Sequence, residues 1–351
     1  MLPHEYVCFT ELPHNRNGKI DRAGLLQNWV KEHTMKDKME RMSMSNDRYQ
    51  LLTKKPQILL LSEKVNGHRI FMYRDDPDDF GFGGNKVHFF EYLIPEIIRE
   101  KPDVLVTSGA MYSNHIRVTA QVAARLGIEC KLFLTEEEMT EPFVGNVALA
   151  KSYGAEIQCI GHAMALLKIG EYVKQLEESG KKVFWVPNGG HTPGAVRAYA
   201  QVMDETMEEL EKQKVHPTTI YLPCASGTTQ AGVLCGAAKR KLPPVVSFAV
   251  ANTQKKAEKG ITRLIQSAAE YLPQGFAPEE VTVHDCGKND YGRPDEELLA
   301  LREKIIKQDG IQLDPSYNIN AFYGMIKELE QTPGTGDVLY INTGGYTELI
   351  R

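Results

Sequence analysis

The sequence predicts an α/β protein with mostly parallel sheets flanked by helices, and three observations lead to this fold class. From Asp103 onward, short β-rich runs alternate with amphipathic stretches. That alternation is typical of βα units, in which helices cover both faces of a parallel sheet. The chain has 351 residues, enough to bury a large core, and this length favours two lobes over one. An Asn-Gly pair at Asn66-Gly67 favours a tight hairpin turn near the start.

The expected elements can be justified in chain order. The hairpin at Asn66-Gly67 joins the runs Gln57–Ser62 and His68–Tyr73. The candidates for parallel strands are Val104–Thr107, Cys130–Leu134, Glu156–Ile160, Val183–Val186, Ile220–Leu222, Val245–Val250, Val281–His284 and Val338–Ile341. The amphipathic stretches that we expect to be helices are His115–Leu126, Met164–Glu178, Ala195–Lys212 and Glu296–Lys307. Because parallel sheets of this kind bind ligands at the carboxyl ends of their strands, we expect the functional site there.

The composition excludes several classes of function. The hydrophobic and charged fractions, 42% and 25%, are those of an ordinary globular protein, and the net charge of -5 argues against a nucleic-acid surface. No apolar run approaches the roughly 18 residues that a membrane span needs, and the N-terminus lacks the apolar segment of a signal peptide. The six cysteines form no Cys-x-x-Cys pair and the ten histidines show no metal-site spacing. We therefore expect buried thiols in a cytoplasmic protein without a metal, nucleic-acid or membrane role.

The most informative residue is Lys86, which ends the tetrapeptide Gly83-Gly84-Asn85-Lys86 before a helical pattern. A lysine that forms a Schiff base needs a lowered pKa, which partial burial provides. The two glycines allow the backbone to approach a flat ring closely, and Asn85 can hydrogen-bond a phenolic oxygen beside the imine. The alternative is a turn that ends in a solvated lysine.

Other motifs accompany this tetrapeptide in a fixed order. They are Arg74-Asp75-Asp76, Thr107-Ser108-Gly109-Ala110 leading into Tyr112-Ser113-Asn114-His115, Pro187-Asn188-Gly189-Gly190, Ala225-Ser226-Gly227-Thr228-Thr229-Gln230-Ala231-Gly232, Tyr291-Gly292-Arg293-Pro294, Leu313-Asp314-Pro315-Ser316-Tyr317 and Asn342-Thr343-Gly344-Gly345. The series resembles the pyridoxal-phosphate enzymes of the 1-aminocyclopropane-1-carboxylate deaminase and D-cysteine desulfhydrase family, which have the tryptophan-synthase-β-like fold. The resemblance extends from about Gln57 to the C-terminus.

The resemblance implies pyridoxal 5'-phosphate as cofactor and an inserted small lobe. It divides the chain into a large lobe formed by residues 48–88 and 200–351 and a small lobe formed by residues 89–199, after a tail at residues 1–47. Lys86 would carry the Schiff base and remove the substrate Cα proton. The family is usually homodimeric, so the resemblance also implies a homodimer.

Residues 226–229 are our candidates for binding the cofactor's phosphate. The loop Ser226, Gly227, Thr228, Thr229 lies between a strand and a helix, where backbone N–H groups and hydroxyls can bind an anion. A plain strand-to-helix turn would have a similar composition, and the family resemblance favours the phosphate site.

Ser113, Asn114 and His115 begin a helix and are our candidates for binding a substrate carboxylate, with Asn114 also beside the cofactor. Ser113 could also be only the N-cap of that helix, and both roles are compatible. By resemblance, Tyr291 and Tyr317 flank the cofactor and the substrate, although unsupported tyrosines are more often core residues. Thr343 matches the position where the fold places a hydroxyl near the pyridine nitrogen.

Three residues depart from the family pattern. Phe89 replaces a cation that helps to hold the phosphate, so the phosphate would depend on backbone amides and hydroxyls. Asn318 replaces an acidic residue or a threonine, and we expect it beside the cofactor ring. Tyr346 replaces leucine or threonine, and we expect its phenol to narrow the substrate pocket. Without an ionised partner the ring is a poorer electron sink, which favours prompt loss of a β-substituent over opening of a cyclopropane ring.

The N-terminal segment, residues 1–26, has a different resemblance. Glu11-Leu12-Pro13 and Asn17-Gly18-Lys19-Ile20-Asp21-Arg22 resemble the last motif of adenylation domains in nonribosomal peptide synthetases. About 26 residues cannot form such a domain, so Lys19 has no adenylation role in this chain alone. A relic of gene fusion, a docking segment and a fragment that completes a truncated partner remain as interpretations.

The sequence therefore predicts a pyridoxal-phosphate-dependent lyase or deaminase. The expected reaction is α,β-elimination on a small β-substituted amino acid such as D-cysteine, with release of ammonia and a 2-oxo acid. The alternatives are a racemase or β-replacement enzyme that supplies nonribosomal peptide synthesis, and a degenerate, non-catalytic partner of that machinery.

Overall fold

The computed structural model describes residues 48–52, 57–75, 80–139, 141–162, 165–274, 276, 280–287 and 292–349. The chain divides into two compact units, Met1–Asp47 and Arg48–Arg351, and the described residues belong to the second. The adenylation-like segment, with Lys19, lies outside the described residues.

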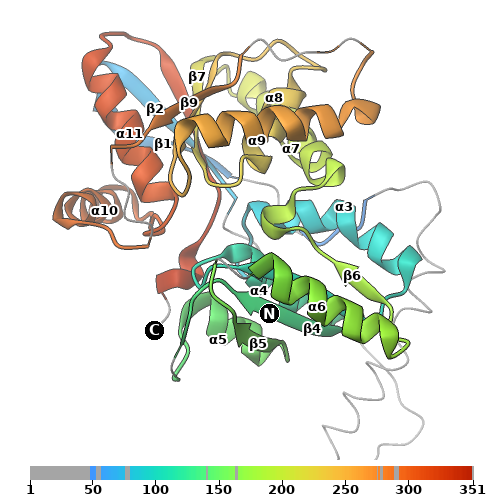
Figure 1. Ribbon diagram of the computed structural model, residues 1–351. Coiled ribbons are helices and arrows are strands. Elements are labelled where there is room, and N and C mark those ends of the chain that lie inside the picture. Colours follow the sequence, from blue (N-terminus) through green and yellow to red (C-terminus); the bar gives the residue numbers. More distant parts are fainter. Residues whose placement is uncertain are drawn as a thin grey trace, which may run out of the picture. The chain divides into compact units, whose positions relative to one another are not determined.

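The larger of two sheets has six strands in the order β1-β2-β10-β7-β8-β9. Figure 1 labels β1, β2, β7 and β9 of this sheet. Its strands are β1 (Gln57–Val65), β2 (His68–Arg74), β7 (Pro217–Cys224), β8 (Val245–Ala249), β9 (Thr282–Asp285) and β10 (Asp337–Asn342). Only the β1–β2 hairpin is antiparallel, with Val65 opposite His68 across the turn; the other pairs are parallel. Asn66 and Gly67 both have positive φ, as the tight turn requires.

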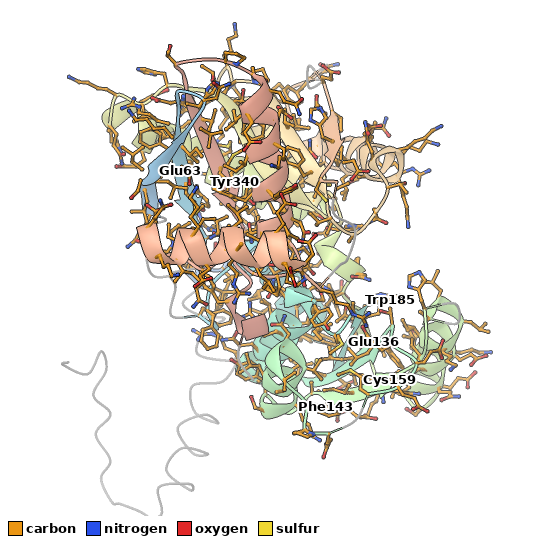
Figure 2. The ribbon with its side chains drawn as sticks, turned by 90° about the vertical axis from the view of Figure 1, so that its left-hand side faces the viewer. Glu63, Glu136, Phe143, Cys159, Trp185 and Tyr340 are labelled. Carbon is orange, nitrogen blue, oxygen red and sulfur yellow. The ribbon has the colours of Figure 1, made fainter. Side chains whose placement is uncertain are left out.

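The smaller sheet has four parallel strands in the order β5-β4-β3-β6. Its strands are β3 (Val104–Gly109), β4 (Glu129–Leu134), β5 (Glu156–Cys159) and β6 (Val183–Trp185). All six residues of β3 are buried, which suits the apolar run of a central parallel strand. Figure 2 shows Glu136, Phe143, Cys159 and Trp185 in the part of the molecule built around this sheet, and Glu63 and Tyr340 in the part built around the larger one.

Helices cover both sheets. They are α3 (Asn85–Glu100), α4 (Asn114–Leu126), α5 (Gly145–Ser152), α6 (Ala165–Glu178), α7 (Pro193–Lys212), α8 (Thr228–Gly236), α9 (Gln254–Ser267), α10 (Glu296–Asp309) and α11 (Asn318–Gln331), with short 3₁₀ turns η1 (Asn188–Gly190), η2 (Ala269–Tyr271) and η3 (Tyr346–Leu349). Figure 1 labels α7, α8, α9, α10 and α11 around the six-stranded sheet. Apolar residues of α7, α8 and α9 form one core with the six-stranded sheet, and those of α10 and α11 form a core on its other face. A third core joins α6 to the four-stranded sheet.

The predicted fold class is confirmed: an α/β fold with mostly parallel sheets flanked by helices. The boundaries of the two lobes remain a prediction. The core of the six-stranded sheet includes Phe89 and the α7 residues Ala195–Tyr199, which the sequence division had assigned to the small lobe.

Parallel pairing brings the carboxyl ends of β2, β10 and β7 together. Asn342 at the end of β10 pairs with Arg74 at the end of β2. Beyond these ends the two backbone segments remain hydrogen-bonded, because Asp75 N donates to Asn342 O over 3.0 Å and Asn85 N donates to Thr343 O over 3.1 Å. The motifs of the sequence analysis therefore meet at one edge of the sheet, where ligands bind in open parallel sheets.

Candidate active site

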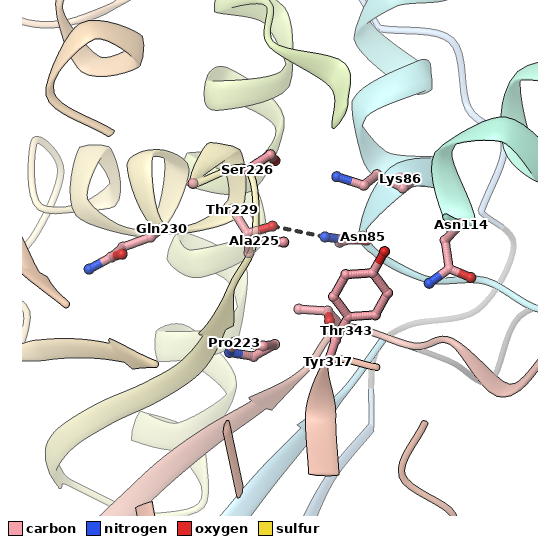
Figure 3. Close-up of a pocket in the computed structure, with 11 residues that line it drawn as sticks. Asn85, Lys86, Asn114, Pro223, Ala225, Ser226, Thr229, Gln230, Tyr317 and Thr343 are labelled. Atoms are coloured by element: carbon pink, nitrogen blue, oxygen red, sulfur yellow. Dashed lines mark hydrogen bonds between the residues drawn. The ribbon is translucent and has the colours of Figure 1, made fainter. Parts of the chain in front are cut away.

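A pocket lies at this edge, between the start of α3 and the start of α8 (Figure 3). Figure 3 shows Lys86 and Asn85 extending from α3 toward Ser226 and Thr229 on the opposite wall, with Tyr317 below them. The pocket is lined by Asn85, Lys86, Asn114, Pro223, Ala225, Ser226, Gly227, Thr229, Gln230, Tyr317 and Thr343. Eight of these were sequence candidates, and they come from α3, α4, α8, the start of α11 and the segments that follow β7 and β10.

Lys86 is half-buried and has no carboxylate partner in the described part of the chain. Its Nζ donates to Gly189 O over 2.9 Å and lies 4.6 Å from the centroid of the Phe89 ring. Burial lowers the pKa of Lys86 from 10.5 to about 7. A lysine in this state is a usable nucleophile and base near neutral pH, because a large fraction of it is unprotonated.

The backbone before Lys86 explains the two glycines. Gly84 has φ of 99°, which only glycine adopts without strain, and its amide donates to Asp75 O over 2.7 Å. A Cβ at Gly344 would lie 2.8 Å from Gly84 Cα, so the two glycine loops touch through their backbones. This close approach places Thr343 directly beside Asn85.

The Ser226–Thr229 loop forms the opposite wall. Gly227 is in the left-handed region, with φ of 85°, and no side chain caps the first turn of α8. The N–H groups of that turn are therefore free to bind an anion, and the hydroxyls of Ser226 and Thr229 line the same wall. Asn85 Nδ2 donates to Thr229 Oγ1 over 2.9 Å, which links the two walls. Thr228 lies behind the wall, where its hydroxyl is 3.2 Å from Ser226 Oγ.

The candidate substrate residues begin α4. Ser113 is the N-cap, and its Oγ accepts from His115 N over 3.2 Å, while Asn114 lines the pocket. His115 is buried against Phe90, with Nε2 2.9 Å from Thr107 Oγ1. Burial, together with the nearby charges of Lys86 and His191, lowers the pKa of His115 to about 3, so the ring is neutral. The side chain of His115 thus does not line the pocket, and only its backbone N–H is at the helix start.

Tyr317 and Thr343 line the pocket, and the buried carboxylate of Asp314 holds the turn at Tyr317 and Asn318. Asp314 Oδ1 accepts from Tyr317 N over 2.6 Å, and Asp314 Oδ2 accepts from the Asn318 amide nitrogen. Burial raises the pKa of Asp314, although hydrogen bonds from Asn318 and neighbouring amides oppose this. Asp314 belongs to the motif Leu313–Tyr317, but the sequence alone predicted no role for it.

Asn318 is fully buried and lies one layer behind the pocket lining. Its Nδ2 faces three acceptors, Asp314 Oδ2, Gly344 O at 2.8 Å and Thr343 Oγ1 at 3.4 Å, while its Oδ1 accepts from Thr343 N over 3.2 Å. These three acceptors fix the orientation of the Asn318 amide, since only its nitrogen can donate to them. Asn318 therefore contacts Thr343, which lines the pocket.

The last two candidates differ in what the structure shows. The hydroxyl of Tyr346, in η3, accepts from Arg74 Nη2 over 3.3 Å and does not line the pocket. Tyr291 lies outside the described residues. The next residue, Gly292, packs so closely that a Cβ there would lie 2.4 Å from the ring of Tyr112, directly before Ser113.

Sequence reasoning missed two buried polar groups near the site. Asp75 accepts from His88 Nε2 over 2.6 Å and from the Tyr199 hydroxyl over 2.7 Å. Arg117 of α4 is fully buried and donates to Gly83 O, three residues before Lys86. The signal for Arg117 was available: a lone cation, three residues after Asn114, on a helix start that is otherwise apolar or uncharged.

No cluster of three or more His, Cys, Asp or Glu side chains among the described residues could hold a metal ion. Among the helices that the structure describes, none combines the length and apolar character needed to cross a membrane.

Comparison with known proteins identifies what the chain is similar to. The model of the family described as pyridoxal-phosphate dependent enzymes matches residues 56–344. The chain is 31% identical over 283 residues to a candidate 1-aminocyclopropane-1-carboxylate deaminase of Pyrococcus abyssi, covering 80% of this chain and 85% of that protein. It is 30% identical over 298 residues to D-cysteine desulfhydrase of Serratia proteamaculans, covering 81% and 88%. A crystal structure of an ACC deaminase homologue aligns with a TM-score of 0.75 and 29% identity, covering 86% of this chain and 93% of that one.

Proposed function

Because the chain belongs to the pyridoxal-phosphate-dependent enzymes, we propose that it catalyses α,β-elimination on a small β-substituted amino acid, with release of ammonia and a 2-oxo acid. The observation that carries this proposal is Lys86: a half-buried lysine with no carboxylate partner in the described structure and a pKa lowered to about 7. The relatives support it, since they are named as D-cysteine desulfhydrases and 1-aminocyclopropane-1-carboxylate deaminases.

The residues present fit pyridoxal phosphate. The uncapped start of α8, with the hydroxyls of Ser226 and Thr229, would hold the phosphate. Asn85 and Thr343 would contact the ring, and Lys86 would bind the aldehyde carbon. When bound, the cofactor supplies an electron-withdrawing ring that stabilises negative charge at the substrate Cα.

Phe89 makes the phosphate depend on this loop alone. Its ring is fully buried and fills the space against Gly190, where a Cβ would lie 2.8 Å from the ring. No cationic side chain is among the residues that line the pocket except Lys86. Neutral donors would therefore hold the phosphate, and we expect weaker cofactor binding than with an added cation.

Lys86 would act as the base that removes the substrate Cα proton. Its amine already donates to Gly189 O over 2.9 Å. With a pKa of about 7 the amine can accept the Cα proton near neutral pH. The Tyr317 ring borders the same space and could relay a proton to the leaving group.

The start of α4 would bind the substrate's carboxylate. Asn114 lines the pocket, and Ser113 and the backbone N–H of His115 lie at the positive end of the helix. Because the His115 ring is neutral, it would add no positive charge here, and the N–H groups of the helix start and the Ser113 hydroxyl would bind the carboxylate.

The contacts of Asn318 support elimination over ring opening. Thr343 would face the pyridine nitrogen, backed by the neutral Asn318 and then by Asp314. A hydroxyl cannot keep that nitrogen protonated as an ionised carboxylate would, so the ring is a weaker electron sink. A good leaving group at Cβ then favours rapid expulsion, whereas a strained carbon–carbon bond needs stronger stabilisation.

Partners and location are further parts of the proposal. A homodimer and a cytoplasmic location follow from the family resemblance and the cysteine pattern. A link to a nonribosomal peptide synthetase would depend on the segment around Lys19, which lies outside the described residues.

The test is a product assay on a panel of D- and L-amino acids, including both cysteines, both β-chloroalanines and 1-aminocyclopropane-1-carboxylate. We expect equal amounts of ammonia and 2-oxo acid from at least one β-substituted amino acid. We also expect slow turnover of D-cysteine and none of the cyclopropane, since Asn318 and Tyr346 differ from those two classes. Inversion of configuration without ammonia would favour a racemase instead, and no reaction at all by cofactor-loaded protein would favour a non-catalytic role.

A further inference from the structure

Arg117 is a buried cation that the proposed reaction does not use. It is the fourth residue of α4, and 1% of its surface is exposed. Its Nε donates to Asn146 Oδ1 over 3.1 Å, its Nη2 to Gly83 O over 3.3 Å, and its Nη1 to Gly81 O. In the described structure no carboxylate lies within ion-pair distance of it, and burial lowers the pKa of Arg117 to about 10. All its acceptors are neutral, so its placement costs more than that of an apolar side chain.

The turn that Arg117 holds, Gly81–Gly84, is strained and leads directly to Lys86 at the start of α3. Four consecutive residues, Gly81 to Gly84, have positive φ, and one of them, Phe82, is not glycine. A Cβ at Gly81 would lie 1.8 Å from the Gln121 side chain of α4. The carbonyl groups of Gly81 and Gly83 thus lie directly against α4, three to five residues before Lys86.

The other end of the cluster reaches the candidate carboxylate site. Asn146, which accepts from Arg117, donates to Tyr112 O over 2.9 Å and to Asn114 Oδ1 over 3.3 Å. Its Oδ1 also accepts from the hydroxyl of Thr347, in the C-terminal turn η3. One guanidinium and one amide therefore contact the loop before α4, the turn before α3 and the last turn of the chain.

These contacts join walls of the pocket that belong to different sheets. The turn Gly81–Gly84 follows β2 of the six-stranded sheet, whereas α4 follows β3 of the four-stranded sheet. We propose that Arg117 is a positioning residue that couples binding of the substrate carboxylate at the start of α4 to the placement of Lys86. This inference rests on the proposed function, which assigns the carboxylate to Ser113–His115.

The geometry explains why arginine is needed for this role. A guanidinium is planar and donates in fixed directions, so any shift of the first turn of α4 moves the carbonyls of Gly81 and Gly83 together. A lysine in its place has one nitrogen and cannot hold both carbonyls and Asn146 in one plane. The coupling is thus lost while the charge is retained.

The experiment compares Arg117→Lys with the matched control Arg125→Lys, an exposed arginine on the same helix that lies over the Phe80 ring. Cofactor-loaded proteins are mixed with saturating glycine or glycinamide, two achiral probes that differ in the carboxylate. The rate of change of the cofactor's visible absorbance is measured for each. We expect Arg117→Lys to slow the reaction with glycine about tenfold, within the usual range of coupling energies, and the reaction with glycinamide less than about twofold. The control should change neither rate.

The possible outcomes distinguish a failure of the coupling role of Arg117 from a failure of the proposed function. If Arg117 has only a structural role, both probes slow by the same factor or neither slows, and the coupling is refuted. If wild-type protein shows no cofactor absorbance or no reaction with either probe, the proposed function fails first. Should Arg117→Lys not fold, Arg117→Gln keeps a planar side chain with a single nitrogen donor, and the glycine-to-glycinamide ratio must still fall for the coupling to stand.

Discussion

Two faces of helix α3 bury a basic group in opposite electrostatic surroundings. On the pocket face, Lys86 contacts a carbonyl and the Phe89 ring, and burial lowers the pKa of Lys86 to about 7. On the other face, His88 is more deeply buried than Lys86, and Asp75 accepts its Nε2–H over 2.6 Å. Burial alone would lower the pKa of His88, yet the charge and hydrogen bond of Asp75 outweigh it and raise that pKa.

The difference shows that the partner, and not the burial, decides whether a buried base is reactive. Glu91 strengthens the charged face: its carboxylate is fully buried and binds Arg48 over 2.7 Å and Leu51 N over 2.8 Å. Asp75 is also held by the hydroxyls of Tyr73 and Tyr199. One face is therefore a closed network that anchors the helix, and the other leaves a single amine free for chemistry.

Replacing Lys86 should have the largest effect. Lys86→Ala removes the only amine that lines the pocket, so covalent attachment of pyridoxal phosphate and all product formation should be lost. Absorbance spectra and mass spectrometry after borohydride reduction measure the attachment. Lys131→Met, at a buried lysine paired with Glu156, is the matched control and should retain both. A reduced adduct on any other lysine would overturn the assignment.

Replacing Asp75 should have the next largest effect, on folding stability. Asp75→Asn leaves the buried His88 facing an amide, and loss of one partner of a buried pair costs about 3 kcal/mol or more. The free energy of unfolding from urea titration measures this loss. Asp337→Asn breaks the exposed pair with Arg69 and should cost much less. Equal costs for the two variants would mean that the charged face of α3 does not anchor the fold.

The sequence predicted the fold well because its signals are local. The Asn66-Gly67 hairpin and the alternation of strands with helices depend on turn chemistry and periodicity, and the structure has both. Lys86, Ser226, Thr229 and Thr343 were also accessible, because each follows a strand end or begins a helix.

The sequence could not reveal contacts that depend on distant pairing. Arg117 lies more than 30 residues from Gly83, and Asn318 is oriented by Gly344 and Thr343 across the sheet edge. Periodicity indicates which side of a helix is buried, but it does not indicate which distant polar group a buried side chain contacts. For that reason Asn318 was expected beside the ring, while its side chain lies behind Thr343.

Adding a cation to the pocket face should tighten cofactor binding. Phe89→Lys places a second ammonium near the phosphate loop, and a charge-assisted hydrogen bond contributes about 1.5–3 kcal/mol if the geometry allows. We expect tighter binding of pyridoxal phosphate, measured by titration of the apo protein, together with lower stability of that apo protein. Phe89→Leu removes the ring without adding charge and should not tighten binding. Equal affinities for the two variants would show that the phosphate lies away from residue 89.

The dependence of apo-protein stability on pH should differ between the two faces, because their contributions have opposite signs. His88 has a folded pKa above its ordinary value of 6.5, so between these two pKa values only the folded state holds the proton and stability falls as pH rises. Lys86 has a folded pKa of about 7 against 10.5, so between these values only the unfolded state holds the proton and stability rises with pH. The two contributions partly cancel in the wild type. The slope of the urea midpoint against pH, measured from pH 6 to pH 9, should therefore be more negative than in the wild type for Lys86→Met, where the opposing rise is gone. For His88→Gln the slope should be more positive than in the wild type. Profiles that shift in the same direction in both variants would contradict the opposite character of the two faces.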